Sequence, residues 1–163
     1  MINFCIFEDS YYKQLLPLTE TRPSYDLLIG TSTIFDKITF YYNYGNITLH
    51  CRDYLKKTLS KQFPDYSINN INSGAPCFFI NGRLVMDNHL ANIFSQIKGK
   101  NNYLFTYNNE VIAAFLRGDL LNNMIELLKG TPTPGEIIQV LRKKCISKEI
   151  DNANVISNIW DTI

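Results

Sequence analysis

The feature that most constrains this chain is a short run that is apolar throughout, Pro76-Cys77-Phe78-Phe79-Ile80, bounded by turn-forming residues. A strand with one solvated face alternates apolar and polar residues, whereas a strand buried on both faces does not. Burial on both faces requires helices on each side of the sheet. The run therefore predicts a central strand in a Rossmann-like, three-layer α/β fold with a mostly parallel sheet.

Strand and helix signals alternate around this run. Residues 1–9 and 47–51 predict further strands, and residues 102–107 and 110–116 flank Asn108-Asn109, which favours positive φ and predicts an antiparallel hairpin. Apolar residues spaced for one buried face, together with capping residues, predict helices. Four helices with predicted N-caps are expected: residues 31–42 with Thr31 or Ser32, residues 54–63 with Asp53, the segment after Asp87 with Asp87 itself, and the segment from Gly118 with Asp119. Two more are expected over residues 136–145 and 152–160.

The charge balance argues against two classes of partner. The chain carries 16 basic and 15 acidic residues, a net charge of +1, whereas nucleic acids and anionic membranes select clustered positive charge. No apolar run reaches the roughly 18 residues of a membrane span, and no basic leader with a long apolar segment is seen. We therefore expect no nucleic acid and no membrane as partner, and a cytoplasmic location. Small anions remain possible ligands at this net charge, because one or two well-placed cationic side chains can bind them.

The cysteines and histidines are spread too widely to indicate a metal or redox site. Zinc sites and redox pairs need closely spaced ligands. We expect buried, reduced thiols and no metal-binding histidine among Cys5, Cys51, Cys77, Cys145, His50 and His89.

One polar stretch follows the first expected strand, Leu15-Leu16-Pro17-Leu18-Thr19-Glu20-Thr21-Arg22-Pro23. A segment that leaves the first strand of an α/β sheet lies at its carboxyl edge, where phosphate sites commonly form. Arg22 offers a rigid fork of donors suited to phosphate or carboxylate, beside a proline that fixes the backbone. We expect Arg22 to bind an anion; the alternative is that it pairs with Glu20 or Asp26 and fastens the loop.

A second arginine is expected at the same edge. Asn81-Gly82-Arg83 directly follows the central run, so Arg83 is expected at the carboxyl edge of the sheet. Arg22 and Arg83 together would bind an anion better than either alone. The alternative for Arg83 is a loop role, in which it donates to backbone carbonyls. Lys37, on the first expected helix, either reaches the anion near Arg22 or is solvated.

These motifs resemble a known family. The stretch ending in Thr21-Arg22-Pro23, then Asp26, Gly30-x-x-Thr33-Ile34 and Asp36-Lys37, is similar to the N-terminal domain of sugar nucleotidyltransferases of Bacteroidetes, described as bifunctional N-acetylglucosamine-1-phosphate uridylyltransferase/glucosamine-1-phosphate acetyltransferase-like proteins. The resemblance continues through Asn81-Gly82-Arg83-Leu84 to Trp160-Asp161. It implies that residues 1–163 form one nucleotide-diphospho-sugar transferase-like domain, the N-terminal part of a longer protein whose C-terminal left-handed β-helix can form an oligomer.

The resemblance also implies a reaction and its site residues. The domain would transfer a nucleotidyl group from a nucleoside triphosphate to a sugar 1-phosphate and release pyrophosphate. Positioning and electrostatic stabilisation of an in-line attack suffice for this, so no side-chain nucleophile is needed. Arg22 is the expected catalytic residue, and the expected substrate-binding residues are Thr19, Thr21, Arg22, Asp26, Lys37, Asn81 and Arg83.

Some residues depart from the general nucleotidyltransferase pattern. Leu18 and Glu20 replace glycines whose lack of a side chain lets backbone N–H groups approach pyrophosphate. Arg83 replaces a magnesium-binding aspartate, although arginine is the expected residue within the closer family. Mg²⁺ is the cofactor that the resemblance implies, but Arg83 would repel the ion there unless Asp9, Glu8 or Asp26 took over as its ligand.

A second interpretation follows from these departures. A non-catalytic regulatory or scaffolding domain could keep the fold and serve to orient a C-terminal acyltransferase or assemble its trimer. Leu28 and Ile38, where close relatives commonly carry arginine and tryptophan, also weaken the phosphate site. A protein-interaction domain without any ligand would leave the two edge arginines without a role.

Overall fold

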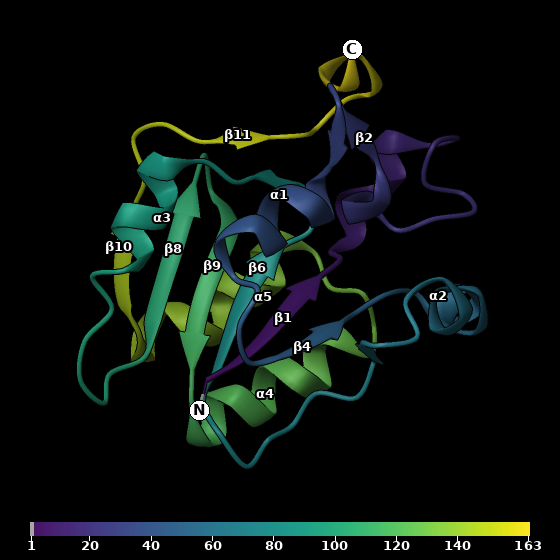
Figure 1. Cartoon of the computed structure of the whole chain (residues 1–163). Coiled ribbons are helices and arrows are strands. Elements are labelled where there is room, and N and C mark those ends of the chain that lie inside the picture. The colour runs from purple at the N-terminus through teal and green to yellow at the C-terminus, as the bar shows by residue number, and fades with distance from the viewer. Residues whose placement is uncertain (1) are drawn as a thin grey trace.

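The computed structural model describes residues 2–163 and is built on a central sheet of seven strands (Figure 1). In their order across the sheet these are β10 (Ile146–Glu149), β8 (Tyr103–Tyr107), β9 (Glu110–Leu116), β6 (Cys77–Asn81), β1 (Asn3–Phe7), β4 (Asn46–Leu49) and β5 (Ser67–Ile68). All neighbours pair in parallel except β9, which is antiparallel to β6 and β8. The expected mostly parallel α/β sheet with an antiparallel hairpin is confirmed.

Helices cover both faces of this sheet (Figure 1). On one face lie α1 (Ile34–Tyr41) and α3 (Asn88–Phe94), and on the other lie α4 (Gly118–Leu128) and α5 (Pro134–Leu141). The helix α2 (Lys56–Gln62) packs at the β5 edge. The predicted three layers are therefore present.

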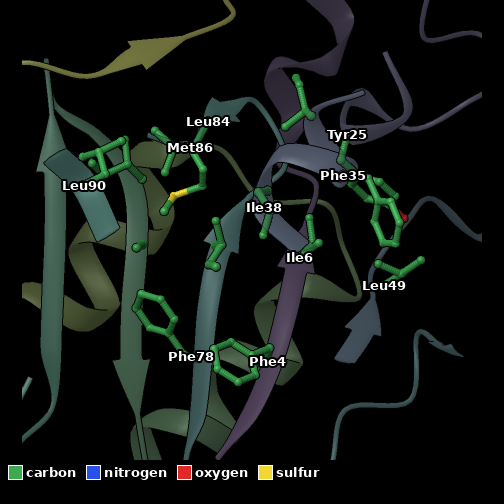
Figure 2. Close-up of a cluster of buried hydrophobic side chains, with 14 of the residues drawn as sticks. Phe4, Ile6, Tyr25, Phe35, Ile38, Leu49, Phe78, Leu84, Met86 and Leu90 are labelled. Atoms are coloured by element: carbon green, nitrogen blue, oxygen red, sulfur yellow. The ribbon is translucent and has the colours of Figure 1, made fainter. Parts of the chain in front are cut away.

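The central run is apolar throughout because alternate residues enter different cores. Phe78 belongs to the same core cluster as Phe4, Ile38 and Leu90, beneath α1 and α3 (Figure 2). Phe79 belongs to the second core, which α4 and α5 cover. Burial of apolar area on both faces, worth about 25 cal/mol per Å², is what positions β1 and β6 side by side at the centre of the sheet.

Two local predictions are confirmed by the backbone. Asn108 and Asn109 have φ values of 49° and 60° and connect β8 to β9, as asparagine permits more readily than other non-glycine residues. The Asp87 carboxylate accepts a hydrogen bond from the backbone N–H of Leu90 at 2.8 Å, so Asp87 caps α3. Both the hairpin and the helix cap are determined by residues close to each other in the sequence.

Two helices differ from the prediction in their bounds, and a third, which begins at Gly118 as predicted, differs only in its cap. The helix α1 begins at Ile34 with Thr33 as its cap, because the residues before it form a small hairpin of β2 (Leu28–Ile29) and β3 (Ser32–Thr33). The helix α5 spans Pro134–Leu141 and is followed by a 3-10 turn, Arg142–Lys144, before the chain enters the unforeseen edge strand β10. Asp119 lies in the first turn of α4 but does not cap it, because Arg117 occupies the N-cap position.

Of two further helix predictions, the first is confirmed over Lys56–Gln62 and differs only at its start, and the second is wrong. The segment expected as a helix over 54–63 opens with a 3-10 turn, Asp53–Leu55, and Asp53 provides no side-chain cap. Residues 152–160 are mostly extended, because β11 (Asn154–Val155) pairs with β7 (Leu84–Val85) and only Ile159–Thr162 forms a 3-10 helix. That pairing links segments far apart in the sequence, and no local pattern reports it.

Other expectations concern the chain ends, the cysteines and membrane spans. The first strand is observed from Asn3 to Phe7, and Met1 lies outside the described residues. Cys5, Cys51 and Cys77 are buried and free, and Cys145 is free and half-buried. Among residues 2–163, every helix is too short or too polar to cross a membrane.

Candidate functional site

Charged side chains gather where β1, β4 and β6 reach the carboxyl edge of the sheet. Glu8 and Asp9 follow β1, Arg52 follows β4 and Arg83 follows β6. Their exposed fractions are 1%, 1%, 6% and 0%. Charged residues are almost never this deeply buried unless they are paired, so each of these side chains must have a partner.

Arg52 fastens the loop in which Arg22 lies. Its Nε donates to Glu8 Oε2 at 2.9 Å, and its Nη2 donates to the carbonyl oxygens of Thr19 at 2.5 Å and Arg22 at 2.9 Å. The guanidinium also stacks 3.9 Å from the centre of the Tyr12 ring. These contacts use the donor fork, the charge and the planar face of arginine together. Sequence reasoning gave Arg52 no role, although its place directly after β4 was a usable signal.

The loop is fastened at further points. Tyr54 donates its hydroxyl hydrogen to the carbonyl oxygen of Glu20 at 2.9 Å, and the Ser24 N–H donates to Glu8 Oε1 at 3.0 Å. Thr19, which is fully buried, donates its hydroxyl to the Tyr12 carbonyl at 2.7 Å. Burial raises the pKa of Glu8, while Arg52 and the Ser24 N–H oppose that rise. The backbone of residues 19–24 is thus fastened to the rest of the domain by hydrogen bonds.

Arg22 itself faces solvent. It lines a pocket of about 430 Å³, and within residues 2–163 its guanidinium takes part in no ion pair. Asp26, the alternative partner, instead accepts hydrogen bonds from Gln62 Nε2 at 3.1 and 3.2 Å. The other residues lining the pocket are Pro17, Leu18, Thr21, Leu27, Leu28 and Thr162.

Lys37 lies on α1, and its Nζ donates to the Ser32 hydroxyl at 3.0 Å. Both residues are half-buried. Lys37 is not among the residues that line the Arg22 pocket. In this structure its ammonium group is therefore engaged by the hairpin that precedes α1.

Arg83 is enclosed by the protein. Its Nε and Nη2 donate to the two Asp9 oxygens at 3.2 and 3.0 Å, Nη2 also donates to Glu110 Oε2 at 2.5 Å, and Nη1 donates to the Ile156 carbonyl at 3.1 Å. Burial alone would lower the pKa of Arg83, but the Asp9 and Glu110 charges outweigh it, so the pKa is raised. The structure does not bring the two arginines to one exposed surface.

Asn81 and Gly82 complete this buried arrangement. Asn81 Nδ2 donates to Asp9 Oδ2 and to the Val111 carbonyl, each at 2.9 Å, and Asn81 Oδ1 accepts the Arg83 N–H. A Cβ atom on Gly82 would lie 2.8 Å from the Tyr25 ring, so only glycine fits there. The Asn-Gly-Arg motif is therefore a packed corner of the fold.

The carboxylates do not fit a magnesium ion bound by the protein. Asp9 is bound by Arg83, Glu8 by Arg52, and Asp26 by Gln62. Within residues 2–163 no three His, Cys, Asp or Glu side chains gather as metal ligands. Mg²⁺ takes oxygen ligands at about 2.0–2.1 Å in near-octahedral geometry, and these oxygens are occupied by nitrogen donors.

In α/β sheets, ligands bind outside the carboxyl ends of the strands, and the loop with the exposed Arg22 lies at that edge. The chain belongs to the sugar nucleotidyl transferase family, whose model matches residues 4–163. The substrates that the family's name implies are nucleotides and sugar phosphates. A comparison with curated proteins found no match.

Solved structures share the fold at low sequence identity. The CTP:phosphocholine cytidylyltransferase of Streptococcus pneumoniae superposes with a TM-score of 0.62 at 10% identity, over 98% of this chain and 95% of that chain. A homolog of Mycobacterium tuberculosis rv0371c from Mycobacterium sp. strain JC1 gives 0.62 at 11% identity, over 98% and 92%. A Bacillus anthracis protein provisionally assigned as a glucose-1-phosphate thymidylyltransferase gives 0.57 at 9%, over 94% and 88%. These similarities establish the fold.

Proposed function

We propose that residues 1–163 form one sugar-phosphate nucleotidyltransferase domain, which binds a nucleoside triphosphate and a sugar 1-phosphate beside the loop of residues 19–24. The observation that carries this proposal is the contrast between Arg22 and its surroundings. The loop backbone is held by Arg52 and Glu8, while the Arg22 guanidinium is exposed and unpaired among the described residues. A fixed loop with a free cation is organised for an anionic ligand.

The reaction proposed is an in-line displacement at the α-phosphorus. A phosphate oxygen of the sugar 1-phosphate forms a bond to that phosphorus, the bond to the bridging oxygen breaks, and pyrophosphate leaves with the electron pair. Arg22 would donate two N–H bonds to the phosphates and stabilise the charge that develops on their oxygens. Arg52 would act as a positioning residue, since it touches the loop and not the substrate.

The predicted substrate-binding residues divide by exposure. Thr21 and Arg22 are exposed and line the pocket, so their polar groups can contact substrate directly. Asp26 and Lys37 are half-buried, lie outside the pocket lining, and would have to leave Gln62 and Ser32 to do so. Thr19, Asn81 and Arg83 are buried and would support the site from within. A cytoplasmic location, where nucleoside triphosphates are available, is part of this proposal.

A second candidate function is favoured by exposed apolar side chains near the same pocket. Leu18, Leu28 and Trp160 have exposed fractions of 38%, 59% and 70%. Thr162 lines the Arg22 pocket together with Leu18 and Leu28, so the C-terminal segment lies beside β2 (Figure 1). In this alternative the domain is the N-terminal part of a longer protein of the bifunctional Bacteroidetes type, and it orients or assembles a C-terminal β-helical acyltransferase.

Calorimetry distinguishes the two functions. A panel of nucleoside triphosphates and sugar 1-phosphates is titrated into wild type, Arg22→Ala and the control Arg142→Ala, which changes another exposed arginine remote in sequence from the loop. The transferase proposal predicts micromolar binding that survives in the control and falls at least about tenfold in Arg22→Ala, the loss of a charged hydrogen-bond donor. Folded wild-type protein that binds none of the panel would favour the scaffolding role.

A further inference from the structure

The Arg83 guanidinium is surrounded by oxygen atoms of the kind that usually bind a metal cation. The Asp9 and Glu110 carboxylates and the Ile156 carbonyl converge on one guanidinium. Asp9 and Glu110 meet at the same nitrogen, Nη2. Carboxylate and carbonyl oxygens are the ligands of hard divalent cations, and here an arginine side chain occupies their centre.

We propose that Arg83 is a resident cation that takes the place of a divalent metal ion at this sheet edge, so that Asp9 and Glu110 bind no Mg²⁺ while Arg83 is present. The charges support this assignment. Two carboxylates that approach the same point repel each other, and one of them would take up a proton if no cation lay between them. One guanidinium supplies charge and directed donors together, and Arg83 itself is fully buried.

The guanidinium also does what a metal ion cannot, because it is part of the chain. Arg83 lies after β6, Asp9 after β1, Glu110 at the start of β9 and Ile156 beyond β11. The Ile156 N–H donates to the Arg83 carbonyl at 2.9 Å, so backbone and side chain of Arg83 both hold the C-terminal segment. A single residue thus joins the ends of four segments that a bound metal would join only when loaded.

Under the proposed function, Arg83 also determines where Mg²⁺ could bind during the reaction. Where the transferase uses Mg²⁺, the ion would be carried by the phosphate oxygens of the nucleotide rather than by Asp9. The reaction would then need Mg²⁺ only because the nucleotide carries it. Without nucleotide, the protein would bind no Mg²⁺. The resident-cation proposal itself does not need the transferase to be active.

Two measurements without nucleotide test the proposal. In the first, Mn²⁺ is titrated into wild type and Asp9→Asn and followed by electron paramagnetic resonance. We expect no Asp9-dependent binding below about 1 mM, where weak surface carboxylate sites begin. One Mn²⁺ bound tightly by wild type and lost in Asp9→Asn would overturn the proposal, whether or not the protein turns over any substrate.

The second measurement removes the resident cation. Arg83→Ala leaves the two carboxylates facing each other, and we expect its thermal unfolding midpoint to rise by several degrees with 5 to 10 mM Mn²⁺ (order-of-magnitude concentrations for a linkage effect). Arg83→Lys, which keeps the charge, and Arg83→Ala with Asp9→Asn should show no such rise. If Arg83→Ala folds and Mn²⁺ leaves its midpoint unchanged, the proposal fails; if it does not fold, the wild-type titration alone decides.

Discussion

Replacing Arg52 by methionine should loosen the loop of residues 19–24 more than it disturbs the rest of the fold. The change removes the ion pair to Glu8 and the two hydrogen bonds to the loop carbonyls. Removing one partner of a buried ion pair costs about 3–5 kcal/mol, because the remaining charge is left uncompensated. Burial already raises the pKa of Glu8, so we expect protonation of its carboxyl to hold the loss near 3 kcal/mol, a rough figure on the same basis.

A double-mutant cycle tests this reasoning. Urea unfolding is measured for Arg52→Met, Glu8→Gln and the double variant, with Arg142→Met as a surface control expected within about 0.5 kcal/mol of wild type. Contacting charges should give a coupling of about 1–3 kcal/mol, so the double variant loses less than both singles together. Hydrogen exchange of the Glu20 and Ser24 amides, which donate to the Pro17 carbonyl and to Glu8 Oε1, should accelerate in Arg52→Met. Additive free energies and unchanged exchange would refute the claim that Arg52 holds the loop.

Two further predictions concern stability. Burial lowers the pKa of His50 in the folded protein to about 4, below its value near 6.5 in the unfolded chain. The free energy of unfolding should therefore be highest above about pH 6.5 and fall by about 3 kcal/mol towards pH 4, because the unfolded chain takes up the proton first. Urea midpoints of wild type and His50→Gln across that range check this, and parallel curves would contradict it. Gly82→Ala should cost about 1–3 kcal/mol, because its Cβ would meet Tyr25 at 2.8 Å. Gly130→Ala, whose nearest neighbour is 3.7 Å away, is the matched control, and an equal effect of both would refute the steric argument.

Much of the fold was predictable because its signals are local. The apolar run of residues 76–80 indicated a central buried strand, observed as β6, without any knowledge of its neighbours. Asn108 and Asn109 identified the hairpin by their tolerance of positive φ. The loop containing Arg22 could be placed at the carboxyl edge because a parallel sheet fixes where each strand ends.

The remaining features depend on contacts between segments far apart in the sequence. Arg52 meets Glu8 across 44 positions, and Arg83 meets Asp9 across 74, so neither pair follows from spacing or periodicity. The same holds for β11, whose partner β7 overrides the helical pattern of its residues. Whether an edge arginine is exposed like Arg22 or enclosed like Arg83 depends on which carboxylates the fold brings to it.

The most direct measurement of the central claim is pyrophosphate release by wild type and Arg22→Ala. Each nucleoside triphosphate is supplied with each sugar 1-phosphate, with Arg142→Ala as the control. The account predicts release from at least one pair, dependent on the sugar 1-phosphate, unchanged in the control and lowered about 10²-fold or more in Arg22→Ala, the scale reported for a lost charge-stabilising donor. Release that is equal in wild type and Arg22→Ala, or no release from any pair by folded protein, would contradict it.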